Sequence, residues 1–535
     1  MSASSKKNAK LTEKQLAQKK EERSVRLYTI GFVVVLTVLL VVAIVSGVNQ
    51  KIVSSGSRER KTIAMTVNGH QISNAELNYY YIDGINSFYS QSGSYAAMYG
   101  LDVTKPLDEQ EISSDGTTWA DNFLESAKSS ASSVYALVDE ANAQGYALSA
   151  DEEAQVTSIS DNLAMYGNLY GYSNAEDYLK AMYGNGASMK SYQEYLRNNI
   201  LADSYQQHYE ASLTYTPDQL RAFEQDREQQ YCSFNYNQYF VSTNSFLTGG
   251  TDDGNGSTTY SDEERAAAAE EAKKVAKSIV SGNIQSPADF DAAIAAAVEG
   301  ASSTAYTNQQ FTAVSSKISD WLSDASRKEG DMTYVESSYT STDAEGKEIT
   351  NISGYYVVYF TSASDNRFPL INVRHILVGF EGGTTDENGQ TVYSDDEKAA
   401  AKAKAEEIYA QWMGAEATEE SFAALATEKT DDTGSAENGG LYENVYPGQM
   451  VSAFNDWCYD ASRKEGDTGI VETEYGYHIM YFVGNADTTY RDYLITNDIR
   501  EDDFNVWYSG LVDSANVTDG VTTYIQKDIV LSRGN

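Results

Sequence analysis

Two histidines stand near opposite ends of one half of a duplicated segment, and the other half has neither. The chain has only four histidines in 535 residues. His375 lies in a strand-like stretch at 371–378 and His478 in another at 476–482, each on an apolar face by the period of two. A single histidine in such a place is more often a hydrogen-bonded core residue than a catalyst. The pair, however, predicts a working site built on imidazoles, which both donate and accept hydrogen bonds.

The duplication itself is read from an eight-residue sequence, DASRKEGD, which occurs at 324–331 and again at 460–467. A tryptophan precedes each copy by three positions, and similar strand-like stretches open and close both repeats. In this alignment Gln238 faces His375 and Tyr356 faces His478. We therefore expect one scaffold copy at 232–366 and one working copy at 367–485.

The elements that must position the histidines follow the same order in both repeats. Ser261 with Glu264 and Ser394 with Glu397 have the spacing of a capping box, which predicts that an alanine-rich helix begins at each serine. Polar insertions at 249–259 and 382–391 are expected to form surface loops. A further polar insertion in the first copy, 339–352, is expected to project as a hairpin or loop.

Charge and hydropathy divide the chain near residue 61. Residues 1–61 carry a net charge of +8, whereas the remainder carries −47. Residues 28–48 are uncharged and apolar, long enough at about 1.5 Å per residue to cross a bilayer core of about 30 Å. The basic tail at 1–27 predicts a cytoplasmic N-terminus by the positive-inside rule. The acidic remainder argues against nucleic acid as a partner.

Beyond a polar linker at 49–61, residues 62–231 favour a mostly helical domain. A hairpin with its turn at Asn68-Gly69 opens this domain, and Ser73 is expected to cap the first helix. The C-terminal segment 486–535 carries aromatic and aliphatic residues at helical spacing, which predicts a helix docked on this domain. The fold class is α+β: a transmembrane helix, a helical domain, and two tandem domains with antiparallel sheets and surrounding helices.

The second repeat resembles the parvulin family of peptidyl-prolyl isomerases over about residues 368–484. The resemblance rests on motifs in family order: RHILV at 374–378, GGL at 439–441, GQM at 448–450 with Phe454 four residues later, and VET at 471–473 before GYHI at 476–479. The hairpin and the helical region before it are similar to the chaperone part of PrsA-like and SurA-like foldases. The first repeat would then be a degenerate parvulin-like domain.

This resemblance implies the roles of individual residues. The catalytic group would comprise a hydrogen-bonded pair, His375 and His478, with Thr473 orienting the imidazoles and Asp432 acting electrostatically near the substrate carbonyl. The substrate proline ring would be bound by Leu441, Gln449, Met450 and Phe454. The alternative for Asp432 is a solvated loop carboxylate, and for Met450 and Phe454 simple core packing. Isomerisation needs no metal and no cofactor, so none is expected.

The sequence therefore predicts a single-pass protein of a bacterial cytoplasmic membrane whose C-terminal domains lie outside. Its partners would be unfolded or newly exported polypeptides that contain X-Pro bonds, and homodimerisation is left open. One alternative is a holdase or peptide-binding scaffold without isomerase activity. Another is a surface adhesion or structural protein that has recruited the repeats.

Overall fold

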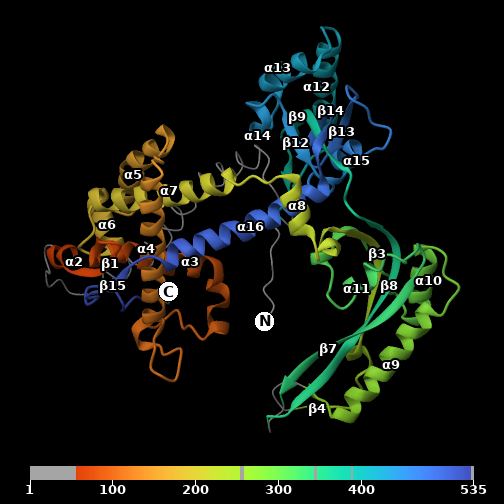
Figure 1. Cartoon of the computed structure of the whole chain (residues 1–535), viewed down its shortest axis with the longest axis horizontal. Helices are drawn as coiled ribbons and strands as arrows, with labels where there is room; N and C mark the ends of the chain where they lie inside the picture. The colour runs from red at the N-terminus through yellow and green to blue at the C-terminus, as the bar shows by residue number, and fades with distance from the viewer. Residues whose placement is uncertain (1–55, 253–257, 343–345, 387–388, 532–535) are drawn as a thin grey trace. The chain divides into compact units, whose positions relative to one another are not determined.

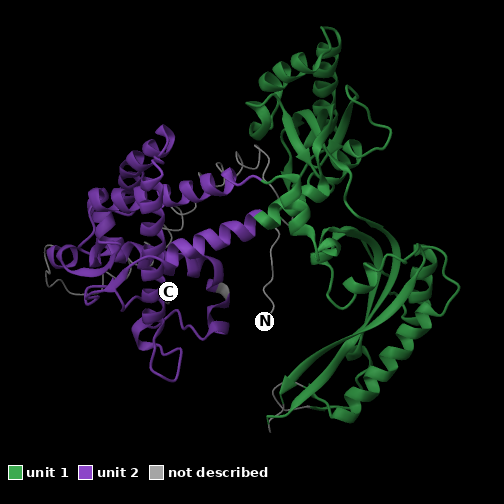
Figure 2. Cartoon of the chain, in the orientation of Figure 1, with its two compact units in different colours: residues 1–18, 215–499 green, residues 19–214, 500–535 purple. Residues whose placement is uncertain are grey.

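A computed structural model describes residues 56–252, 258–342, 346–386 and 389–531 (Figure 1). The chain forms two compact units, coloured separately in Figure 2. In the described residues, the helical unit comprises 56–214 and 500–531, and the sheet unit comprises 215–499. No helix among the described residues has the length and apolar composition to cross a membrane. The expected tail at 1–27 and span at 28–48 lie outside those residues and remain predictions.

The helical unit is built from long helices around a small sheet. Its elements are α2 (Ser57–Lys61), β1 (Ile63–Val67), β2 (His70–Ser73), α3 (Asn74–Ser92), η1 (Gly93–Tyr99), η2 (Leu107–Glu109), α4 (Trp119–Ala143), α5 (Ala150–Leu169), α6 (Ala175–Tyr183), α7 (Met189–Ser212), the later part of α16 (Tyr490–Asp513), and β15 (Val517–Asp519). The expected linker at 49–61 thus ends in a short helix, α2.

The predicted hairpin is confirmed. β1 pairs antiparallel with β2, and positive φ angles at Asn68 and Gly69 make the turn between them. The Ser73 side chain accepts a hydrogen bond from the backbone N–H of Glu76, so the predicted cap of α3 is also present. The C-terminal segment returns to this hairpin, because β15 pairs with the free edge of β1 from Val67↔Val517 onward.

A carboxylate lies among tyrosines between the helices of this unit. Asp83 on α3 accepts hydrogen bonds from the hydroxyls of Tyr183, at 2.7 Å, and Tyr195, at 2.8 Å. Burial raises the pKa of Asp83 to about 6 in spite of these bonds. Burial likewise raises the pKa of Glu76 to about 7, opposed by the hydrogen bond from Tyr135. Both carboxyls are therefore neutral more readily in the folded unit than in the unfolded chain.

We expect the helical unit to lose stability as the pH rises through about 4 to 7, because the folded state binds these protons more tightly than the unfolded state does. Asp83→Asn removes the charge and should stabilise the unit above pH 6. The rise of the pKa from 3.8 to about 6 corresponds to about 3 kcal/mol, which is an upper limit because the side chain is half-buried and partly screened by solvent. Hydrogen exchange of α3 amides should show added protection at pH 7.5 and none at pH 4.5. Asp161→Asn, at an exposed site on α5, is the control. Reduced protection at pH 7.5 in Asp83→Asn would contradict the assignment.

The sheet unit contains both repeats. After α8 (Pro217–Glu224) and η3 (Glu228–Tyr231), the first has β3 (Ser233–Ser242), η4 (Thr243–Phe246), β4 (Thr251–Asp252), β5 (Thr258–Thr259), α9 (Asp262–Val280), α10 (Pro287–Ala297), β6 (Thr304–Gln310), η5 (Phe311–Ala313), α11 (Ser319–Leu322), β7 (Met332–Thr342) and β8 (Glu348–Ser364). The second has β9 (Pro369–Gly379), β10 (Thr384–Thr385), β11 (Thr391–Val392), α12 (Asp395–Met413), α13 (Glu419–Lys429), α14 (Thr433–Ala436), β12 (Leu441–Val445), α15 (Ser452–Cys458), β13 (Thr468–Thr473) and β14 (Gly476–Thr489).

The two repeats have the same sheet topology and the same register. The strand orders are β6-β3-β8-β7 and β12-β9-β14-β13, which are equivalent positions in the two repeats. Gln238 pairs with Val358 in the first sheet, and His375 pairs with Met480, the equivalent residue, in the second. Both predicted capping boxes are present. The insertions expected as loops instead contain short hairpins, β4–β5 and β10–β11, and the 339–352 insertion is a hairpin extension of β7 and β8.

The duplicated DASRKEGD sequence makes the same structural contacts in both copies. The guanidinium of Arg463 lies 4.0 Å from the ring centre of Trp457, and that of Arg327 lies 4.4 Å from Trp321. Each glycine of the motif then donates a backbone hydrogen bond to the final strand of its repeat, at 2.9 and 3.0 Å. This motif therefore fixes the turn before the last two strands and belongs to the scaffold rather than to the site.

The second sheet is covered on both faces. On one face Ile376, Val378 and Ile479 pack with α12 and α13, and in Figure 1 these helices lie together beside the sheet. On the other face Ile371, Val373, Met480 and Phe482 pack with α15. The period of two carries His375 and His478 onto this second face, as their strand patterns predicted.

A buried junction joins α8, the segment between the repeats, and the first turns of α16. Leu220, Tyr231, Leu370, Tyr490 and Leu494 form its apolar cluster. This packing explains why the compact units divide at 214/215 and 499/500, away from the expected domain boundaries at 231/232 and 485/486. Those domain boundaries themselves remain predictions. The helix expected in 486–535 is α16, and the strand β15 after it was not foreseen.

Candidate functional site

The two histidines meet on adjacent strands. His375 lies on β9 and His478 on β14, and their Nδ1 atoms are 3.0 Å apart. The imidazoles stack with centroids 5.2 Å apart and planes at 22°. Their residues are 2% and 5% exposed, so both rings are buried among apolar neighbours. A buried polar pair of this kind is stable only when its remaining nitrogens also find partners.

Asp432 supplies the partner at one end of the pair. Its Oδ2 lies 2.8 Å from Nε2 of His375, and the hydroxyls of Ser435 and Tyr442 donate to the same oxygen at 2.6 and 2.7 Å. Asp432 is also the N-cap of α14, because its Oδ1 accepts from the backbone N–H of Gly434. The side chain is only 13% exposed. The structure therefore brings Asp432 into contact with the histidine pair, which the solvated-loop alternative did not anticipate.

Thr473 supplies the partner at the other end. Its Oγ1 lies 2.8 Å from Nε2 of His478 and accepts from the backbone N–H of Tyr475. A carboxylate only accepts, so Nε2 of His375 must carry the proton that it donates to Asp432. In the neutral pair Nδ1 of His375 then accepts from Nδ1–H of His478, and Nε2 of His478 accepts from the Thr473 hydroxyl. The hydrogen bonds run in one direction, from Thr473 to Asp432.

One additional proton reverses two of these three hydrogen bonds, the one between Thr473 and His478 and the one between the two histidines. If both nitrogens of His375 are protonated, Nδ1–H of His375 donates to His478, and Nε2–H of His478 donates to Thr473. The Thr473 hydroxyl can then donate to the Gly476 carbonyl, which is 3.4 Å away. Both arrangements satisfy every nitrogen of the pair without moving a strand. In both arrangements Nε2–H of His375 donates to Asp432.

Phe454 on α15 lies over the histidines. Its ring meets those of His375 and His478 edge-on, with centroid distances of 5.5 and 5.4 Å, and the residue is 2% exposed. Met450 packs against the same apolar cluster and is half-buried. The Gln449 side chain is turned toward its own loop, where Oε1 accepts from the backbone N–H of Tyr446 at 3.0 Å. The structure therefore groups Phe454 and Met450 with the histidines and gives Gln449 a contact within the loop.

The expectation for Leu441 needs correction. Leu441 pairs with Arg374 on β9, and opposite residues of an antiparallel pair share a face, so Leu441 points away from His375. Tyr442 pairs with Val373 and therefore shares the face of His375. The Tyr442 ring stacks on the His375 imidazole at 4.9 Å and 24°. Tyr442 thus occupies the place beside the pair that was assigned to Leu441.

Three further residues belong to the site. Ser435 contacts both Asp432 and His375, and its position three residues after Asp432 is an N-cap spacing that could have indicated it. Tyr442 shares a face with Val445, three residues later, because the register shifts between them, so strand alternation from Val445 would have selected Leu441 instead. Arg374 donates to the carbonyls of Asn438 and Gly439, holding the turn from which Gly440 accepts the His375 backbone N–H. No local pattern indicated that contact.

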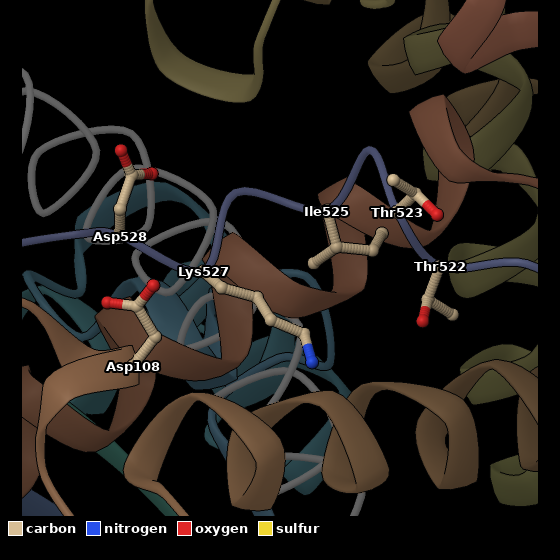
Figure 3. Close-up of a pocket in the computed structure, with 6 residues that line it drawn as sticks. All are labelled: Asp108, Thr522, Thr523, Ile525, Lys527 and Asp528. Carbon is tan, nitrogen blue, oxygen red and sulfur yellow. The ribbon is translucent and has the colours of Figure 1, made fainter.

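A separate pocket of about 500 Å³ lies in the helical unit (Figure 3). Its lining comes from η2 and the C-terminal segment: Asp108, Thr522, Thr523, Ile525, Lys527 and Asp528. Lys527 forms an ion pair with Asp121 at 2.8 Å. The pocket contains none of the residues of the histidine site, and we assign it no function.

Comparison with known proteins agrees with this geometry. Residues 356–485 match the profile of the PPIC-type PPIASE domain. The foldase protein PrsA 1 of Listeria innocua is 36% identical over 115 residues, which are 22% of this chain and 31% of that protein. The chaperone SurA of Chromohalobacter salexigens is 35% identical over 112 residues, which are 20% of this chain and 21% of that one. The chain thus spans about a third of the length of the PrsA relatives that it matches.

Among solved structures, the peptidylprolyl isomerase PrsA from Bacillus anthracis is 25% identical in sequence. The aligned part is 28% of this chain and 59% of the PrsA chain, and the TM-score is 0.17. The sequence matches confirm that the second repeat is a parvulin-type domain and that the chain is similar to PrsA and SurA foldases.

Proposed function

We propose that residues 367–485 catalyse cis/trans isomerisation of X-Pro bonds in newly exported polypeptides. The observation that carries this proposal is a buried series of side-chain hydrogen bonds that runs through Thr473, His478, His375 and Asp432 beneath Phe454. These residues lie within the segment that matches the PPIC-type domain. Rotation about an X-Pro bond is slow because of the partial double-bond character of its C–N bond. An enzyme accelerates it by binding the twisted bond better than either planar form.

In this mechanism Phe454 and Met450 bind the proline ring, and the imidazole pair forms the polar floor of the site. Asp432 sets the charge next to His375, and Thr473 orients His478. Gln449 supports the turn that carries Met450. No bond to the substrate is formed or broken, so the reaction requires neither a nucleophile nor a metal or cofactor.

The first repeat is, in our proposal, a degenerate parvulin-like copy without catalytic activity. It keeps the sheet order and register, but Gln238 and Tyr356 replace the histidines. The segment between α10 and β6, residues 298–303, is also shorter than the equivalent segment between α13 and β12, residues 430–440. In the second repeat that segment carries Asp432 and Ser435. The first copy therefore lacks the loop as well as the imidazoles, and its proposed role is to bind or space client chains.

Isomerisation of a short X-Pro peptide, followed by NMR exchange spectroscopy with the purified full-length chain, tests the main proposal. We expect clear acceleration over the buffer rate. The competing function is a holdase, which is favoured by the deep burial of Phe454 over the pair. A folded chain that suppresses client aggregation but leaves isomerisation at the buffer rate would support the holdase instead.

We further propose that residues 28–48 anchor the chain in a bacterial cytoplasmic membrane, with the N-terminus inside and the acidic domains outside. The uncharged apolar stretch and the basic residues before it support this topology. Protease added to intact protoplasts should digest the domains after residue 56 and leave an epitope at the N-terminus protected. Digestion only after lysis would contradict it.

A further inference from the structure

Tyr442 contacts both the carboxylate and the imidazole of the site, as Ser435 does, but it makes these contacts from the sheet. It is the second residue of β12 and is 2% exposed. Its hydroxyl donates to Oδ2 of Asp432 at 2.7 Å, and its ring stacks on His375 at 4.9 Å. A phenylalanine could provide the ring contact alone. The hydroxyl therefore points to a second function, which acts on Asp432.

The Asp432 carboxylate is placed by several donors. Oδ2 accepts from Tyr442, Ser435 and Nε2 of His375, whereas Oδ1 accepts from the Gly434 backbone. Ser435 and Gly434 lie on α14, which Asp432 caps, so they move with it. Tyr442 is on β12, which is paired with the strand of His375. Its hydroxyl is thus a bond from the rigid sheet to the loop that carries the carboxylate.

We propose that Tyr442 is a positioning residue: it holds the Asp432 carboxylate against Nε2 of His375 and thereby fixes the direction of the hydrogen bonds along the pair. The inference deepens the proposed isomerase function and rests on it. With the carboxylate held, His375 keeps its Nε2 proton and presents Nδ1 to His478. Without the hydroxyl, the carboxylate loses its bond to β12, and the opposite tautomer of the neutral pair, with the His375 proton on Nδ1, becomes accessible.

Other charged groups near the carboxylate are engaged elsewhere. Asp431, the preceding residue, accepts from the backbone N–H of Gly379 at 2.9 Å. Arg374 points to the opposite face of the sheet, where it pairs with Glu419 at 2.9 Å. The second imidazole, His478, is linked to Asp432 through His375. Asp432 is thus a charged group in hydrogen-bond contact with His375.

The test compares Tyr442→Phe with Tyr409→Phe in the full-length chain. Tyr409 is a matched control, because its hydroxyl is also hydrogen-bonded, at 2.7 Å to Thr468, on the α12 side of the domain. We expect Tyr442→Phe to lower kcat/KM about tenfold, the equivalent of about 1.4 kcal/mol, on the acid side of the pH profile. The acid limb should move to higher pH, because a carboxylate that loses a donor takes up a proton more readily. Tyr409→Phe should leave the profile in place.

Nitrogen-15 NMR of the imidazoles provides a readout independent of activity. Only four histidines are present, and His70 and His208 serve as references. Tyr442→Phe should shift the Nε2 signal of His375, whereas Tyr409→Phe should not. Unchanged imidazole signals together with an unchanged pH profile in Tyr442→Phe would overturn the proposal.

A double-mutant cycle with Asp432→Asn then separates action through Asp432 from direct contact with the substrate. If Tyr442 acts through Asp432, adding Tyr442→Phe to Asp432→Asn should cost little further activity. Additive losses would overturn the positioning role. A wild-type chain without isomerase activity would refute the proposed function, and the imidazole signals would still decide whether Tyr442 positions Asp432.

Discussion

Replacing Phe454 by alanine is expected to lower kcat/KM for a short X-Pro peptide by about a hundredfold or more. The ring covers both imidazoles, and truncating a buried phenylalanine removes about 3–5 kcal/mol of packing, part of which would act on the bound proline. Because α15 packs on the sheet through the same ring, a loss of folding stability should accompany the loss of rate. Thermal melting must therefore be measured with the kinetics.

The duplicated fold supplies a matched control. Ile318 occupies the position of Phe454 in the first repeat and is fully buried there. Ile318→Ala should cost about 2–5 kcal/mol of stability in its own repeat and leave isomerisation unchanged. Full isomerase activity in a folded Phe454→Ala chain would show that the proline ring is bound elsewhere.

Arg491→Ala is expected to destabilise the sheet unit by about 3–5 kcal/mol, because it leaves a buried carboxylate without its main partner. The Arg491 side chain is 3% exposed and forms an ion pair with Glu224, which is 8% exposed. Its guanidinium also donates to the backbone carbonyls of Asp365, at 2.9 Å, and Glu228, at 2.7 Å. This one side chain therefore connects α16 with α8, η3 and the segment between the repeats.

Urea unfolding of the sheet unit measures the effect. Arg367→Ala is the control: Arg367 also pairs with Glu224, at 2.8 Å, but its side chain is 54% exposed, so we expect a loss below about 1 kcal/mol. Removing both charges, in Arg491→Met with Glu224→Met, should recover much of the loss. A cost of less than about 1 kcal/mol for Arg491→Ala would mean that the apolar cluster alone holds the junction.

Local patterns in the sequence determined much of the second repeat. The capping boxes of α9 and α12 were predictable because a helix start depends on residues within one turn. The common face of His375 and His478 was predictable because strand alternation needs no tertiary information. The duplicated motifs then aligned the two sheets, and the register in the structure matches that alignment.

Only the tertiary structure decided which loop residues complete the site. Leu441 and Tyr442 are adjacent, and a shift of one residue along a strand exchanges its two faces, so motif spacing alone selected the wrong neighbour. The pairing of β1 with β15 joins residues 450 positions apart, Val67 and Val517, and no local signal encodes such a partner. The sequence also left the position of Asp432 undecided, because it shows a carboxylate in a loop but not the strand against which that loop packs. Contacts of this kind depend on how separate elements pack, and sequence periodicity describes only each element by itself.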